Sequence, residues 1–380
     1  MRIAIVTSSY PLAEIDGAAA AGLFVRDFAH ELAKNDHEIH VITQDKGEGC
    51  SYSPEGVTVH CFKWPGKARP LSKLNPRNPL DAYAAFRYLR SGRKALFDLH
   101  DQSPIDHVLG MWAVPGGFIA NRLMKFRQVP YSVWCLGSDI WTYGKIPVLN
   151  QLVVGVLHNA KRRYADGLRL REDAHRLAFC DIEFMPSSRA ISREGVEPVG
   201  MDRASPRFQF VGRYDMVKGV DVLLQAMRMY LDRGHTGSLR MLGGGAMDDE
   251  VRAMARDLDL LEAVHIGGYA DGSEVVASIL GCDALVIPSR NESIPLVFSD
   301  ALRLGKPVIA SDVGDMGDLL REVPAGLIVP PEDPEALADA FEEFADAPPG
   351  RFTSEVEALG RRFEIESTAR RFLRDIGAGV

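Results

Sequence analysis

The stretch F-V-G-R-Y-D-M-V-K-G-V-D-V-L-L-Q-A, residues 210–226, decides the fold of the second half of the chain. An apolar run ends at Val211, Gly212 turns the chain, and an amphipathic helical pattern follows. Arg213 and Lys218 therefore lie just beyond the carboxyl end of a strand, the edge where doubly wound sheets bind ligands. Two cations at this edge suit a diphosphate, because a guanidinium binds it in a forked geometry and an ammonium as a compact charge.

The alternation of strand and helix continues on both sides of this segment. Strands are predicted at residues 2–7, 38–43, 57–62, 108–111 and 131–136, and again at 208–211, 239–242, 263–266, 284–287 and 308–310. Helices are predicted at residues 22–34, 81–97, 117–126, 220–231, 249–258, 274–280 and 296–304. This pattern predicts an α/β protein with two Rossmann-like domains, each a doubly wound parallel sheet.

A polar segment with several glycines and prolines separates the two series. We expect an N-terminal domain over residues 1–190, a linker over 191–206 and a C-terminal domain over 207–363. Two such domains joined by one linker predict a ligand cleft at the carboxyl ends of the strands. A last amphipathic helix, within residues 364–380, is expected to pack back toward the N-terminal domain.

The composition is that of an ordinary globular protein. The chain has 380 residues, of which 46% are hydrophobic and 25% charged, which excludes disorder and a small disulfide-built scaffold. Five cysteines are scattered without a C-x-x-C pair, and no apolar stretch reaches the ~18 residues of a membrane span. With no signal-peptide pattern at the N-terminus, we expect a cytoplasmic chain with reduced thiols and no zinc framework.

The formal net charge of −8 is distributed unevenly. Residues 1–190 carry 24 Lys and Arg against 19 Asp and Glu, a balance of +5, whereas residues 191–380 carry 20 against 33, a balance of −13. The acidic total argues against nucleic acid as a partner, and the basic first half favours an anionic one.

A second group of polar residues lies between residues 286 and 311. A predicted strand ends at Pro288, Glu292 follows in a loop, and a helix begins near Pro295. The free amides and the dipole at a helix start favour phosphate, and proline suits the first helical turn. Glu292 and Asp300 are eight residues apart, and their carboxylates are suitable acceptors for sugar and ribose hydroxyls.

These segments resemble the donor site of the family 4 retaining glycosyltransferases, which have the GT-B fold. The family pattern G-R-x-x-x-x-K-G is matched by Gly212, Arg213, Lys218 and Gly219. The pattern P-S-x-x-E-x-x-P/G-L-V-x-x-E-A is matched by Pro288, Ser289, Glu292, Pro295, Leu296, Val297 and Asp300, with aspartate in place of the second glutamate. Further matches cover residues 305–314 and 326–338.

The resemblance implies specific roles. Arg213 and Lys218 would bind the diphosphate of a UDP- or GDP-sugar, Glu292 the transferred sugar, and Asp300 the ribose. Backbone at residues 243–245 and 267–268, including Gly244 and Gly268, would line the nucleotide pocket. The donor is a substrate, and neither a metal nor another cofactor is expected.

The N-terminal half matches the family less closely. Gly22, at the entry to the first helix, and Gly17, in the loop before it, are candidates to approach the donor phosphate or the acceptor. The family's histidines at the ends of two strands are replaced by Met111 and Leu136. Asp139 is then the best polar candidate to contact the acceptor, and we group it with Glu292, Arg213 and Lys218 as catalytic.

The resulting hypothesis is a retaining glycosyltransferase that moves a sugar from a nucleotide diphosphate to a glycan or lipid-linked acceptor, in polysaccharide or glycoconjugate biosynthesis. Two alternatives stay open. One is a sugar-nucleotide-binding protein that has lost catalysis, and the other is a GT-B-fold sugar-nucleotide epimerase.

One basic segment suggests where the acceptor is bound. Only Asp81 opposes nine basic residues, and four aromatic side chains are interleaved with them. The basic residues are Lys63, Lys67, Arg69, Lys73, Arg77, Arg87, Arg90, Arg93 and Lys94, and the aromatic ones are Trp64, Tyr83, Phe86 and Tyr88. This composition predicts peripheral binding to an anionic membrane surface; a solvated basic helix is the alternative.

Overall fold

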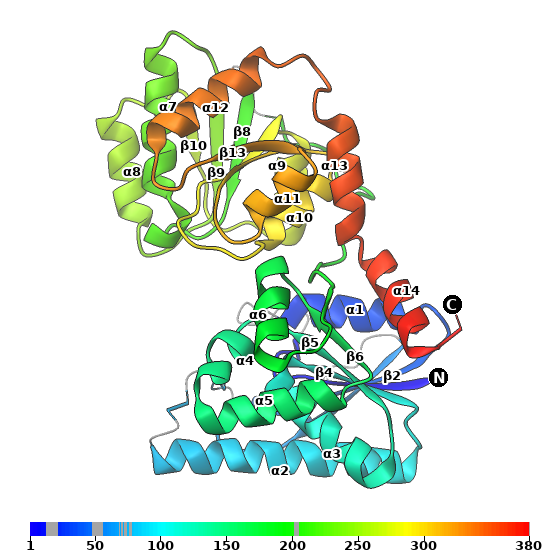
Figure 1. Cartoon of the computed structure of the whole chain (residues 1–380). Helices are drawn as coiled ribbons and strands as arrows, with labels where there is room; N and C mark the ends of the chain where they lie inside the picture. The colour runs from blue at the N-terminus through cyan, green and yellow to red at the C-terminus, as the bar shows by residue number, and fades with distance from the viewer. Residues whose placement is uncertain are drawn as a thin grey trace. The chain divides into compact units, whose positions relative to one another are not determined.

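The computed structural model describes residues 1–12, 22–47, 56–67, 69, 71, 74–75, 78–200 and 205–379. The chain forms two compact units (Figure 1). Unit 1 consists of Met1–Ala190 together with Ile365–Val380, and unit 2 is Ile191–Glu364. Each unit has a parallel sheet covered by helices, so the predicted fold class, two doubly wound α/β domains, is confirmed.

Unit 1 has a seven-stranded sheet in the order β3-β2-β1-β4-β5-β6-β7. The strands are β1 (Arg2–Val6), β2 (Glu38–Gln44), β3 (Val57–Phe62), β4 (His107–Met111), β5 (Tyr131–Cys135), β6 (Arg162–Ala165) and β7 (Glu183–Phe184). The order reverses beside β1, where Val6 pairs with Ile42 on one side and Gly110 on the other. Ligands bind at such a reversal in doubly wound folds.

Helices cover both faces of this sheet. They are α1 (Leu23–Ala33), α2 (Pro79–Gln102), α3 (Phe118–Arg127), α4 (Ser138–Trp141), α5 (Pro147–Asn159), α6 (Leu168–Ala178) and α14 (Ile365–Ile376). Residues of α2, α3, α5 and α6 build one core, and residues of α1 and α14 build the other. Helix α2 begins with Asn78 as its cap and Pro79 in its first turn, so it starts before the predicted range.

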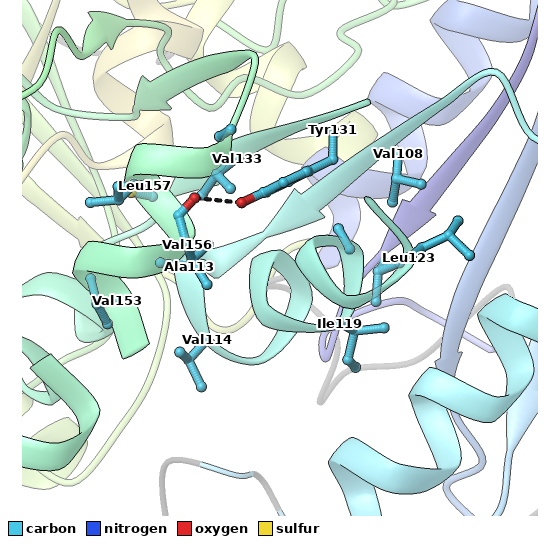
Figure 2. Packing of buried hydrophobic residues seen from close by; sticks show 14 of the residues in the cluster. Val108, Ala113, Val114, Ile119, Leu123, Tyr131, Val133, Val153, Val156 and Leu157 are labelled. Atoms are coloured by element: carbon cyan, nitrogen blue, oxygen red, sulfur yellow. Dashed lines mark hydrogen bonds between the residues drawn. The ribbon is translucent and has the colours of Figure 1, made fainter. Parts of the chain in front are cut away.

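Figure 2 shows the packing of the first of these cores. Aliphatic side chains from α3 and α5 lie against the β4 and β5 side chains Val108 and Val133. The single buried hydroxyl in this view, that of Tyr131, donates a hydrogen bond of 2.5 Å to the Val156 carbonyl. The sheet is therefore held on this face by apolar contact, with its buried polar atom paired.

The last helix, α14, lies in unit 1 beside α1 (Figure 1). Its Phe372 ring packs edge-on against Phe28 at 5.7 Å. Arg371 donates to the Phe184 carbonyl at 2.9 Å, and Lys161 donates to the Ile376 carbonyl at 2.8 Å. The core of unit 1 is thus built from segments far apart in the chain.

Unit 2 has a six-stranded sheet in the order β10-β9-β8-β11-β12-β13. The strands are β8 (Arg207–Val211), β9 (Ser238–Leu242), β10 (Val264–Ile266), β11 (Ala284–Ile287), β12 (Val308–Ser311) and β13 (Gly326–Val329). The helices are α7 (Val220–Asp232), α8 (Asp248–Asp257), α9 (Gly272–Leu280), α10 (Leu296–Arg303), α11 (Met316–Glu322), α12 (Pro334–Asp346) and α13 (Thr353–Gly360). Phe208 packs among residues of α7 and α12, whereas its neighbour Gln209 bonds Ser278 of α9, so α7 and α9 cover opposite faces.

The described part of the expected linker packs on unit 2. The Val199 amide donates to the Ala277 carbonyl at 3.0 Å. Arg240 donates to the carbonyls of Val199 and Gly200 at 2.9 and 3.1 Å. Residues 191–200 therefore follow the surface of unit 2 and are grouped with it.

The cysteines differ in state. Cys135, Cys180 and Cys282 are free, whereas Cys61 on β3 is disulfide-bonded. The expectation of reduced thiols is therefore wrong for Cys61. Among the helices that the structure describes, none is long and apolar enough to cross a membrane.

His107, at the start of β4, is a buried histidine from which we expect a dependence of stability on pH. Its ring is fully buried, Nε2 bonds Ser132 at 2.8 Å, and Nδ1 has no hydrogen-bond partner among the described residues. Burial, with Lys161 adding to it, lowers the pKa of His107 to about 3. Because the unfolded ring binds a proton below about pH 6.5 and the folded ring does not, acid favours the unfolded chain.

We expect the free energy of unfolding to fall as pH drops below ~6.5, by up to about 1.4 kcal/mol per pH unit from this ring. Equilibrium denaturation of His107→Gln between pH 7 and 4 should show a shallower loss than the wild type. His175→Gln, at an exposed position of α6, is the control for the loss of a histidine outside the core. Equal slopes in all three proteins would refute this account of His107.

Candidate active site

The strand order of unit 2 reverses between β8 and β11, and both predicted motifs lie at this reversal. Gly212 and Arg213 follow β8 directly, and the loop that carries Ser289 and Glu292 follows β11. Since parallel strands end at one edge of the sheet, the topology brings the two loops together. The candidate site of unit 2 therefore occupies the position that doubly wound sheets use for ligands.

The structure brings Lys218 and Glu292 into direct contact through an ion pair. Their side chains are only 19% and 18% exposed. Gly219 permits this approach, because it has a φ of +65° and a Cβ there would lie 2.1 Å from the Pro288 carbonyl oxygen. The glycine after Lys218 is thus required for the close contact of the two loops.

The loop after β12 (residues 312–315) also approaches Glu292. Gly314 has a φ of +56°, and a Cβ on it would lie 2.0 Å from the Glu292 carbonyl oxygen. Helix α10 begins at Leu296, shortly after Glu292. The sequence predicts Pro295 in the first helical turn, whereas in the structure Pro295 is the cap residue that precedes the helix. The amides of Leu296 and Val297, in the first turn of α10, are among those that a helix leaves without intrahelical partners.

The two predicted cations, Arg213 and Lys218, both lie at this edge. Lys218 is half-buried, and its burial, with the nearby positive charge of Arg213, lowers the pKa of the ammonium group. Arg213 is exposed, and a terminal nitrogen of its guanidinium lies 3.3 Å from a carboxylate oxygen of Asp215. An anion that displaced Asp215 or Glu292 would meet two cations beside the start of α10, which is an anion-binding arrangement.

Backbone hydrogen bonds join the glycine-rich loop after β9 to the loop after β10, and the loop after β8 to the end of β9. The Gly243 amide donates to Gly268 at 2.9 Å, and the Gly212 amide donates to Leu242 at 3.0 Å. Gly244, predicted to line the nucleotide pocket, is buried, and its carbonyl accepts from the Tyr269 hydroxyl at 3.1 Å. In this structure Gly268 is exposed at the edge, whereas Gly244 lies beneath the Tyr269 ring.

Two predicted donor residues lie inside the protein. Asp300 on α10 is fully buried, so its carboxylate does not line an open surface. Ser289 is 1% exposed, and its hydroxyl has no hydrogen-bond partner among the described residues. The structure therefore groups Arg213, Lys218, Glu292 and the start of α10, but not Asp300 or Ser289, at the accessible edge.

In unit 1 the corresponding reversal lies between β1 and β4. Gly22 caps α1, where an added Cβ would lie 3.0 Å from the Ser9 backbone, so glycine lets the helix approach the loop after β1. Gly17 lies outside the described residues. Trp112 follows β4 with a φ of +61°, which is rare for a bulky side chain and stores local strain.

The structure does not support Asp139 as a residue that contacts the acceptor. Its carboxylate is fully buried and accepts from the Ala113 amide at 2.8 Å and the Leu136 amide at 3.3 Å. Burial raises the pKa of this carboxyl group. Asp139 thus ties the segment after β4 to the one after β5.

Sequence reasoning missed one ion pair at the unit 2 edge. Arg290 donates to Asp221 through two bonds of 2.8 Å, between the loop after β11 and the start of α7. Both residues lie inside the two motifs, at Ser289-Arg290 and Gly219-Val220-Asp221. Their position next to Lys218 and Glu292 was the available signal.

Comparison with known protein families gives matches in both halves of the chain. Residues 194–356 match the model for glycosyl transferases group 1, and residues 20–181 match the model for the glycosyl transferase 4-like domain. The D-inositol 3-phosphate glycosyltransferase of Mycolicibacterium gilvum is 31% identical over 380 residues, which cover 92% of this chain and 83% of the relative. That of Frankia alni is 32% identical over 51% of this chain and about half (50%) of its own length.

Solved structures share the fold. Sucrose-phosphate synthase from Thermosynechococcus elongatus has a TM-score of 0.70 at 20% identity, covering 98% of this chain and 97% of its own. HepE of Anabaena, in complex with UDP, has a TM-score of 0.70 at 15% identity, covering 98% and 99%. Two Rossmann-like units with these neighbours define the GT-B fold. The chain belongs to the group 1 glycosyltransferases and is a nucleotide-sugar-dependent enzyme.

We expect Arg213→Ala and Lys218→Ala each to weaken nucleoside diphosphate binding about tenfold or more. Charge-assisted hydrogen bonds contribute roughly 1.5–3 kcal/mol, and about 1.4 kcal/mol corresponds to a factor of ten. Calorimetric titration with UDP and GDP measures the effect. Arg256→Ala, exposed on α8, is the control and should bind like the wild type; wild-type affinity in both site variants would contradict the assignment.

Proposed function

We propose that the enzyme transfers a sugar, with retention of configuration, from a UDP- or GDP-sugar to a glycan or lipid-linked acceptor. The observation that carries this proposal is the contact of Lys218 with Glu292 at the reversal between β8 and β11. One residue of the pair suits phosphate and the other sugar hydroxyls. The UDP complex of the structural neighbour HepE is consistent with a uridine donor.

The chemical task is the departure of a diphosphate while positive charge develops on the sugar. Arg213, Lys218 and the first amides of α10 would stabilise the leaving group electrostatically. The departing phosphate can accept the proton of the acceptor hydroxyl, so the step does not need a histidine at Met111 or Leu136. Because two protein cations neutralise the diphosphate, we also propose that no metal is required, which assays with and without a chelator test.

Glu292→Gln should lower turnover more than Asp300→Asn. Glu292 is accessible at the edge and would contact the reacting sugar, whereas Asp300 is fully buried and does not line the open surface. We expect a loss of roughly 100-fold for Glu292→Gln, typical of a lost transition-state contact, and less than about tenfold for Asp300→Asn.

Incubation of nucleotide sugars with and without acceptors, followed by product analysis, measures these effects and separates transfer from isomerisation or no reaction. The control is Glu250→Gln, an exposed acid on α8. Equal turnover of Glu292→Gln and wild type would contradict the role of Glu292.

We further propose that the enzyme binds the inner face of an anionic membrane through α2 and α3. A groove of about 460 Å³ is lined by Arg87, Arg90, Ser91, Arg93, Lys94, Phe97 and Phe126. Beside it, Leu80, Tyr83 and Phe86 are 76%, 53% and 60% exposed. Basic and large apolar side chains on one surface suit a headgroup layer.

The described residues refine this surface. Trp64 and Tyr88, grouped with the exposed aromatics in the sequence, are buried in the core. Arg69 is held by two bonds to Asp81, of 2.6 and 3.0 Å. Lys73 and Arg77 lie outside the described residues. The surface is therefore assigned to residues 80–97 of α2 and Phe126 of α3, which we name the α2 basic face.

Vesicle sedimentation tests this proposal. We expect binding to vesicles that contain phosphatidylglycerol and none to pure phosphatidylcholine, with loss at high salt, because each Lys or Arg near the headgroups contributes about 1 kcal/mol. Glutamine at Arg87, Arg90, Arg93 and Lys94 together should abolish binding. Glutamine at Arg252, Arg256, Arg351 and Arg361 of unit 2 removes the same charge and should not. Indifference to vesicle charge would favour a soluble acceptor.

A further inference from the structure

Arg290 joins its own loop to three other segments at the carboxyl edge of the unit 2 sheet. Its guanidinium forms the two 2.8 Å bonds to Asp221, donates to the Met216 carbonyl at 2.6 Å, and donates through Nε to Glu332 at 2.7 Å. Its own backbone amide donates to the Val217 carbonyl at 2.8 Å. A single residue of the loop after β11 thus holds the turn after β8, the start of α7 and the loop after β13.

These contacts surround Lys218 in sequence. Met216 and Val217 precede it and Asp221 follows it, so the turn is fixed on both sides of the lysine. Arg290 itself lies two residues before Glu292. Arg290 therefore holds the turn that carries Lys218 and belongs to the loop that carries Glu292. Its contacts affect the position of both members of the Lys218–Glu292 pair.

The chemistry of the Arg290–Asp221 ion pair suits positioning of the loops better than stabilisation of the fold. The Arg290 and Asp221 side chains are 20% and 19% exposed, whereas Glu332 is 65% exposed. Desolvation offsets much of the attraction within a partly buried ion pair, so the presence of the pair is weak evidence for stabilisation of the fold. A guanidinium fork on a carboxylate has a defined planar geometry, however, which lysine cannot reproduce.

We propose that Arg290 and Asp221 form a positioning clamp that sets Lys218 against Glu292. The inference rests on the proposed function for the role of Lys218 and Glu292 toward the donor, but the geometry of the clamp can be tested without it. Neither clamp residue contacts the reacting groups; each acts through the turn that carries Lys218.

The chain offers a matched control at the amino ends of the same two strands, β8 and β11. Arg207, at the start of β8, donates to Asp283, just before β11, through its Nε at 3.1 Å and its terminal nitrogen at 2.8 Å. This second fork is also partly buried, at 34% and 28% exposed. Arg207→Gln therefore removes a similar ion pair without touching the Lys218 turn.

Hydrogen exchange with mass spectrometry tests the geometry. In Arg290→Gln and in Asp221→Asn, amides of residues 216–220 and 290–294 should exchange at least several-fold faster than in the wild type. Arg207→Gln should leave both segments unchanged. Arg290→Lys, which keeps the charge but loses the fork, should behave like Arg290→Gln. Unchanged exchange in Arg290→Gln, or wild-type exchange in Arg290→Lys, would overturn the clamp.

Nucleoside diphosphate affinity then tests the consequence for the site. We expect Arg290→Gln to weaken UDP or GDP binding about tenfold, and Lys218→Ala to add less than about threefold in that background, because the two residues act as one unit. Full additivity would overturn the coupling. If the wild type binds neither nucleotide, the proposed donor fails, while the exchange result still decides the clamp.

Discussion

The reversal of strand order between β8 and β11 is the constraint on which the candidate site depends. The helix after β8, α7, covers one face of the sheet, and the helix after β11, α10, contacts the strands from the other. The loops that lead to these helices therefore diverge and leave room at the edge. Lys218 comes from the first loop and Glu292 from the second, so their contact follows from topology as well as from charge. Gly219 and Gly314 make the approach possible, because a side chain at either position would meet backbone oxygen.

The predictable parts of this protein are those encoded by neighbouring residues. The alternation of β-branched runs and amphipathic stretches predicts most strands, and the spacing of Gly212, Lys218 and Glu292 places the site at a sheet edge. Strand β6 is not predicted by the sequence pattern, because its first residues, Arg162 and Arg163, are charged and do not form an apolar run. Its backbone nevertheless pairs with β5 through Ser132 and Val133, so neighbouring strands override its local pattern.

Burial of acidic residues is the part that the sequence does not encode locally. Asp139 and Asp300 each follow a predicted ligand edge, where an acid is ordinarily exposed, yet both are fully enclosed. For Asp139 the cause is visible, since amides from two separate loops converge on its carboxylate. The Arg290–Asp221 pair escapes sequence reasoning for a related reason. Its members are 69 residues apart, and their contact exists only once the sheet is ordered.

The placement of α14 in unit 1 has a consequence for synthesis on the ribosome. Unit 2 is one continuous segment, so all of it is available before residues 365–376 have been made. Unit 1 is still incomplete at that stage, because the α1 face of its sheet lacks Ile365, Phe372 and Leu373, which are buried there. The domain that begins the chain is therefore the last to complete its core. A truncation near the C-terminus would expose apolar surface on unit 1 and leave the residues of the candidate site in unit 2 intact, with aggregation of the nascent chain as the foreseeable result.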